Sequence, residues 1–177
     1  ACVAIATSIH VSAILFVLAY WIYPMRLVDR TLYVVLAVGF LIGLAGVSGW
    51  AIDLVVRTVG VDAVVAEKLL QYDESGLETS HANPYLSYAL GILKRAFILP
   101  LLIVGQRYVD KGIEPVYRGM VNLLIFGNLI YFMFILAVPV VTRLALPFLY
   151  MEIFLLSYLL VSVESFKIRV LLFLALA

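Results

Sequence analysis

The sequence predicts an all-α integral membrane protein, a multi-spanning helical bundle of about five full spans and a truncated sixth. Hydrophobic residues make up 66% of the 177 residues and charged residues 13%, whereas soluble domains average about 45–50% and about 25%. The apolar residues also fall in runs that approach the roughly 20 helical residues needed to cross a bilayer. A soluble fold of this length could not bury so much apolar surface.

Five stretches have the length and composition of membrane spans: 3–22, 32–50, 88–106, 117–138 and 142–163. The apolar run from Gly119 to Val163 would form a single helix of about 67 Å, twice the bilayer, so we expect two spans that turn at Pro139. The apolar residues 170–177 are too few to span and predict the start of a sixth helix. Because the chain begins with Ala1 and ends inside that run, we expect one transmembrane region, 1–177, cut from a larger protein.

The basic residues predict which ends of the spans share a side. The connectors 24–31, 106–118 and 164–169 hold seven of the twelve basic residues, and two spans separate each connector from the next. Cytoplasmic loops are enriched in Lys and Arg, so we expect all three connectors at the cytoplasmic face. The polar loop 50–95 then lies outside, together with the outer end of the span that begins near Arg143.

The polar loop 50–95 is the one long stretch that apolar residues do not dominate, and it holds several candidate site residues. Asp53 and Asp73 are external acids that could accept a proton from a sugar hydroxyl, or could simply be solvated. Arg57 follows Asp53 by four residues, the spacing of a local helical ion pair, and is a weaker candidate for binding phosphate.

Lys94 and Arg95 fall inside the third predicted span, where an isolated charge is unfavourable by several kcal/mol. Two interpretations stay open. The helix could begin near Lys94, with both cations at lipid headgroups, or both side chains could face a wet cavity. Together with Arg143 they could form a positive pocket at the outer leaflet. Pro100 predicts a bend in this span.

Arg143 and Glu152 lie in the fifth predicted span. A guanidinium binds phosphate oxygens in a bidentate manner, so Arg143 is a candidate clamp for a phosphate or diphosphate, and the alternative is an arginine that reaches to the interface from a helix end. Glu152 is a candidate because carboxylates are rare inside membranes, and the alternative is a structural, hydrogen-bonded side chain. In a straight helix these two residues would lie on opposite faces.

His10 lies in the first predicted span and is either a proton acceptor or a core histidine bonded to a nearby hydroxyl. No second His or Cys shares its face, and Cys2 is the sole cysteine, so we expect no metal site. Phosphate-binding, dinucleotide-binding, serine-hydrolase and zinc-protease motifs are absent from the sequence, so it carries no visible signature of a nucleotide-binding, serine-hydrolase or zinc protein. No cluster of basic residues indicates nucleic-acid binding.

Three stretches resemble the EpsG-like family of polysaccharide polymerases, which are related to the Wzy O-antigen polymerases. The first is IATSIHVSAILFVLAYWI, centred on His10. The second is EKLLQYDESG, with Lys68 and Tyr72 four residues apart. The third is TRLALPFLYMEIFLLSYLL, which begins at Thr142 and Arg143. In this resemblance the chain corresponds to the C-terminal part of the family's proteins.

The resemblance implies a GT-C-like glycosyltransferase of the bacterial cytoplasmic membrane, acting in exopolysaccharide, capsule or O-antigen synthesis. Such an enzyme joins oligosaccharide repeat units carried on undecaprenyl diphosphate at the outer face, without a cofactor. Membrane lipid and other polysaccharide export proteins are candidate partners.

The implied reaction assigns roles to the candidate residues. Residues expected to bind the diphosphate are Arg143, Arg95, Lys94 and Arg57. Residues expected to act as the base are His10, Asp53, Asp73 or Glu152, and Tyr72 is expected to contact the substrate. Two alternatives remain: a transporter or flippase for a lipid-linked or anionic solute, and a non-catalytic subunit.

Overall fold

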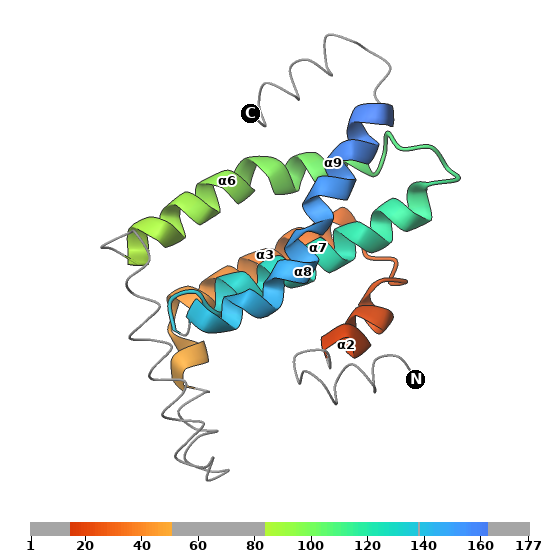
Figure 1. The fold of residues 1–177 in the computed structure, drawn as a ribbon. Coiled ribbons are helices and arrows are strands. Elements are labelled where there is room, and N and C mark those ends of the chain that lie inside the picture. Colours follow the sequence, from red (N-terminus) through yellow and green to blue (C-terminus); the bar gives the residue numbers. More distant parts are fainter. Residues whose placement is uncertain (1–14, 51–83, 138, 163–177) are drawn as a thin grey trace.

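The computed structural model describes residues 15–50, 84–137 and 139–162. These residues form helices α2 (Leu15–Ile22), α3 (Asp29–Leu44), α6 (Pro84–Gly105), α7 (Glu114–Phe134), the 3-10 helix η2 (Pro139–Ala145), α8 (Leu146–Leu149) and α9 (Met151–Ser162) (Figure 1). No strand occurs among them. The predicted all-α class is therefore confirmed.

Fewer helices than expected can cross a membrane. Within the described ranges three stretches are long and apolar enough, Tyr88–Gly105, Glu114–Phe134 and Val141–Ser162, so the predicted count of five full spans is wrong there. The second predicted span fails because α3 has only 16 residues and is followed by a turn at Gly46, whose φ is 68°. Residues 1–14 of the first span and the whole predicted sixth helix lie outside the described residues.

Helix α7 is the element against which the bundle assembles. It contacts α2, α3, η2, α8 and α9, and in Figure 1 α3 runs alongside it. Two glycines of α3 explain the close approach. A Cβ at Gly43 would collide with the Phe132 carbonyl, and one at Gly39 would collide with the Leu129 side chain. The Gly-x-x-x-Gly spacing predicted this packing face from the sequence.

The turn predicted at Pro139 is confirmed. Helix α7 ends at Phe134, and η2 begins at Pro139 and runs back along α7. A Cβ at Gly127 would lie 2.7 Å from the Phe148 Cβ, so a glycine is needed where α8 crosses α7. The segment after the turn is a 3-10 helix, a short helix and then α9, rather than one straight helix.

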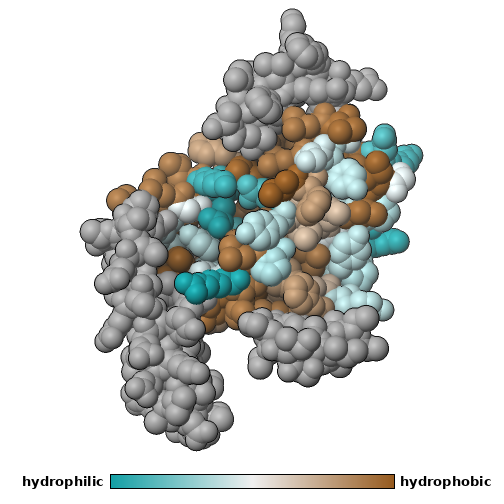
Figure 2. All heavy atoms as spheres, in the orientation of Figure 1, coloured by the Kyte–Doolittle hydropathy of each residue, from teal (hydrophilic) through white to brown (hydrophobic). Residues whose placement is uncertain are grey.

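The connectors 24–31 and 106–118 lie together at one end of the bundle, as the distribution of basic residues predicted. An ion pair of 2.5 Å joins Arg107 Nη2 to Asp29 Oδ2 across 78 residues of sequence. Figure 2 shows hydrophilic residues near the N-terminal end of α7 and near α6, among strongly hydrophobic and weakly hydrophilic residues. The first of these regions lies at the connector end.

Candidate functional site

Arg95 is the centre of a polar cluster between α6, α7 and α9. Its Nε donates a hydrogen bond of 2.6 Å to Asn128 Oδ1, and its Nη1 donates one of 3.0 Å to the Gly91 carbonyl. The guanidinium carbon lies 3.8 Å from the centroid of the Tyr131 ring, over its face. Two hydrogen bonds and a ring contact therefore fix the plane of the guanidinium.

The α7 side of the cluster is itself held in place. Asn128 is fully buried, and its Nδ2 donates a 2.8 Å hydrogen bond to the Leu124 carbonyl, which turns Oδ1 toward α6. Gly91 leaves room for the Tyr131 hydroxyl, because a Cβ there would collide with it. Polar side chains inside apolar spans commonly join neighbouring helices. That rule could have drawn attention to Asn128, which the sequence interpretation missed.

Glu152 and Lys94 complete the cluster. Glu152 Oε1 lies 3.6 Å from Lys94 Nζ, and the Glu152 side chain is 21% exposed against 66% for Lys94. Glu152 also interacts electrostatically with Arg95. It occupies the first turn of α9, where the helix dipole favours a negative charge. The carboxylate therefore has two cations from α6 as neighbours.

Arg95 lies near the middle of Tyr88–Gly105, the stretch of α6 that is long and apolar enough to cross a membrane. Arg95 precedes Gly105, the end of α6, by ten residues, which is about 15 Å of helix and half of a hydrocarbon core of about 30 Å. Because α6 begins at Pro84 and continues through Pro100, the interpretation that the helix starts near Lys94 is wrong. The two cations instead lie inside a continuous span.

An apolar pocket of about 240 Å³ adjoins Arg95 between α3, α6 and α7. Apart from Arg95 and Tyr33, its lining consists of aliphatic, proline and phenylalanine side chains: Leu36, Ala37, Phe40, Ile92, Ala96, Leu99, Pro100 and Phe132. A fixed guanidinium beside an apolar pocket can bind a molecule that has both an anionic group and a hydrocarbon portion.

The structure does not bring Arg143 into this cluster. Arg143 is exposed in η2 and borders a separate pocket of about 60 Å³ together with Phe16 of α2 and Phe148 of α8. That pocket shares no lining residue with the one beside Arg95. The helices α8 and α9 are separated at Tyr150. The prediction that Arg143 and Glu152 lie on opposite faces assumed one straight helix, so it does not apply.

The remaining predicted site residues lie outside the described residues: His10, Asp53, Arg57, Tyr72 and Asp73. The cluster of Lys94, Arg95, Asn128, Tyr131 and Glu152 is therefore the candidate site that the described structure offers. Within the described residues no three His, Cys, Asp or Glu side chains could hold a metal ion.

These features define a class: a helical membrane protein whose spans enclose a fixed cation beside an apolar pocket. The chain belongs to the EpsG family, whose model matches residues 1–177. This membership connects the protein with polysaccharide synthesis and with glycosyltransferase-like polymerases. No curated protein and no solved structure matches the chain, so the GT-C relation stays a prediction.

Proposed function

We propose that this protein is a polysaccharide polymerase that joins oligosaccharide repeat units carried on undecaprenyl diphosphate at the outer face of the bacterial cytoplasmic membrane. The observation that supports the proposal most is the guanidinium of Arg95, fixed by Asn128 and Tyr131 beside an apolar pocket. A lipid diphosphate combines the two chemistries that such a site would accept.

The reaction forms a bond between an acceptor hydroxyl oxygen and the anomeric carbon of the donor sugar. The bond from that carbon to the diphosphate oxygen breaks, and the diphosphate leaves with the electron pair. Negative charge grows on the leaving group, and fixed cations at that position lower the barrier. Arg95 would serve this role through its fixed plane, and Lys94 would add a second, more mobile charge.

A base must take the proton of the acceptor hydroxyl. Glu152 is the carboxylate of the cluster and lies 3.6 Å from Lys94 Nζ, and a carboxylate can accept a proton from a hydroxyl group. Binding of the diphosphate to Lys94 would compete with the Lys94–Glu152 ion pair. The carboxylate would then be released to face the acceptor. His10, Asp53 and Asp73 remain alternative bases.

The test is complementation in the full-length protein with Arg95→Lys and Arg95→Ala, with polymer length read on a gel and membrane abundance measured. We expect both variants to lose long polymer while single repeat units still reach the cell surface, because lysine lacks the planar fork of arginine. Arg26→Gln is the control for loss of one basic residue, since Arg26 is exposed in the α2–α3 connector. Normal polymer in both Arg95 variants would refute the assigned role.

A transporter for a lipid-linked solute is the second candidate. The observation that favours it is the interrupted segment of η2, α8 and α9 with Glu152 paired to Lys94, because broken helices with charged residues mark the sites of many transporters. In the same experiment, repeat units that never reach the outer surface would support transport instead of polymerisation.

A further inference from the structure

The two connectors form a second polar pocket, at the opposite end of α6 from Pro84. Its volume is about 660 Å³. Its lining holds four cations, Arg30, Arg107, Lys111 and Arg118, and two carboxylates, Asp29 and Glu114. This pocket shares no residue with the cluster around Arg95, and the proposed polymerase reaction does not use it.

The charges of this pocket are not balanced. Asp29 pairs with Arg107 at 2.5 Å, and Glu114 pairs with Arg118 at 2.9 Å. Both carboxylates are thereby occupied, while Arg30 and Lys111 make no ion pair with any residue that the structure describes. Two cations therefore remain available to a ligand.

An amide donor also remains available. The Nε2 atom of Gln106 is buried and has no hydrogen-bond partner among the described residues, and Gln106 lines the same pocket. A buried donor without an acceptor is unfavourable. An acceptor oxygen on a ligand would satisfy it.

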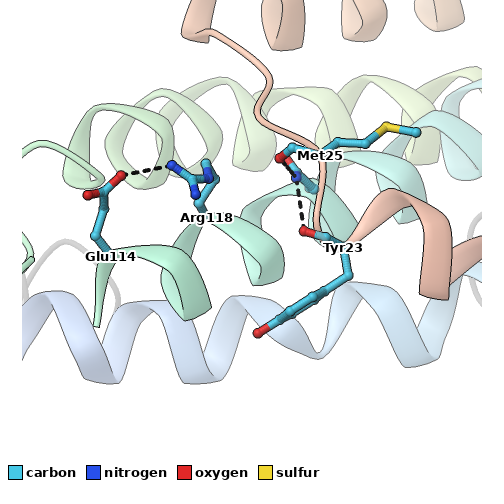
Figure 3. Close-up of polar contacts among 5 residues, drawn as sticks. Tyr23, Met25, Glu114 and Arg118 are labelled. Carbon is cyan, nitrogen blue, oxygen red and sulfur yellow. Dashed lines mark hydrogen bonds and ion pairs between the residues drawn. The ribbon is translucent and has the colours of Figure 1, made fainter. Parts of the chain in front are cut away.

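The pocket is held in its shape by contacts to α7. The Nδ2 of Asn122 lies within hydrogen-bond distance of three carbonyls at the end of α2 and in the connector, those of Ile22, Tyr23 and Met25, at 3.2, 3.4 and 2.8 Å. Figure 3 shows the Tyr23 and Met25 contacts, and the Glu114–Arg118 pair on the same helix. The Asp29–Arg107 pair then joins this connector to the next one. The cations are therefore presented by two connectors that are tied together.

We propose that the connector pocket is a second anion site, which binds a phosphate group through Arg30, Lys111 and Gln106. The ends of α6 and α7, two helices that are long and apolar enough to cross a membrane, flank the pocket, and a phospholipid headgroup would lie at the end of such helices. Leu27 and Val109 add apolar walls, which suits a phosphate attached to a hydrocarbon group. A soluble phosphate compound offers the same anionic chemistry.

The test uses the purified full-length protein in a neutral detergent. Binding is followed as the increase in thermal unfolding temperature on titration, at constant ionic strength. One arm adds micelles of phosphatidylglycerol, with phosphatidylcholine as the uncharged comparison, and the other arm adds inorganic phosphate. Saturation with phosphatidylglycerol alone assigns the site to a lipid headgroup, and saturation with inorganic phosphate as well assigns it to a free phosphate group.

The variants Arg30→Gln and Lys111→Gln are each expected to weaken binding about fivefold, the effect of one basic residue near an anionic lipid surface. Arg26→Gln removes the same charge from the same connector but does not line the pocket, so it should bind as the unchanged protein does. Lys111→Arg keeps the charge and should retain binding, which separates lost binding from lost folding.

Two results would overturn the proposal. An equal loss in Arg26→Gln would show a diffuse surface potential instead of a pocket. A loss in Arg95→Ala without a loss in Arg30→Gln would place the bound anion in the other site. Because the two sites share no lining residue, failure of this proposal leaves the polymerase assignment untouched.

Discussion

Replacing Asn128 by alanine should impair polymer synthesis far more than it impairs folding. Asn128 is fully buried, and its Oδ1 accepts the hydrogen bond from Arg95 Nε. Alanine removes that acceptor and leaves Arg95 in contact with the Gly91 carbonyl and the ring of Tyr131. The guanidinium would then be free to leave the plane that its three contacts define.

The size of the effect follows from the kind of hydrogen bond that is lost. A hydrogen bond to a charged group contributes about 1.5–3 kcal/mol. If that interaction orients Arg95 toward the leaving diphosphate, its loss lowers the rate by about 10- to 150-fold. The rate is measured in membrane vesicles that contain equal amounts of each variant, as the increase in polymer length with time.

Asn122→Ala is the matched control, because Asn122 is a second buried asparagine of the same helix. It contacts the α2–α3 connector instead of Arg95. We expect this variant to unfold at a lower temperature while polymerising at a normal rate per molecule. Equal rates per molecule in the Asn128 and Asn122 variants would refute the orienting role and leave both asparagines as structural links.

Three further predictions test the packing and the charges. Gly43→Ala should lower the unfolding temperature of the detergent-solubilised protein, because its Cβ would meet the Phe132 carbonyl and overpacking costs about 1–3 kcal/mol. Gly49→Ala is the control, because its Cβ would lie 3.6 Å from the Ala137 Cβ, which is an ordinary contact distance. Glu152→Gln should abolish polymerisation without changing the abundance of the protein, whereas the control Glu114→Gln, at the connector end, should leave polymerisation intact. Activity in the Glu152 variant would exclude Glu152 as the base. Tyr131→Phe keeps the aromatic face and should retain most activity, while Tyr131→Leu should lose about 0.5–2 kcal/mol of cation–π interaction, seen as slower polymer growth.

Features that depend on local rules could be predicted from the sequence. The turn at Pro139 follows from the length of the apolar run, and the packing of Gly39 and Gly43 follows from their spacing on one helical face. The position of the two connectors at one end follows from the distribution of basic residues. Each of these needs only the period of a helix or the thickness of a membrane.

Features that depend on the angle between helices could not be predicted. The lengths of the hydrophobic runs overestimated the number of membrane spans, because they do not show that α3 ends before the turn at Gly46. The partner of Arg95 is 33 residues away in sequence, and periodicity does not say which face of α7 is turned toward α6. The sequence grouped Arg143 with Lys94 and Arg95 only because all three were expected near the outer leaflet. In the structure, η2 contacts α7 and α8, and Arg143 therefore lies beside a different pocket.

The charge balance of the cluster favours the proposed binding site over a purely structural link. The described cluster holds two cations, Lys94 and Arg95, and one carboxylate, Glu152, so its formal charge is positive. An uncompensated charge inside a membrane is unfavourable, and a purely structural link would be more stable with one cation replaced by an apolar side chain. An anionic group of a lipid carrier would remove the excess charge. The imbalance that weakens the unliganded bundle is therefore the property that would favour binding of a lipid diphosphate.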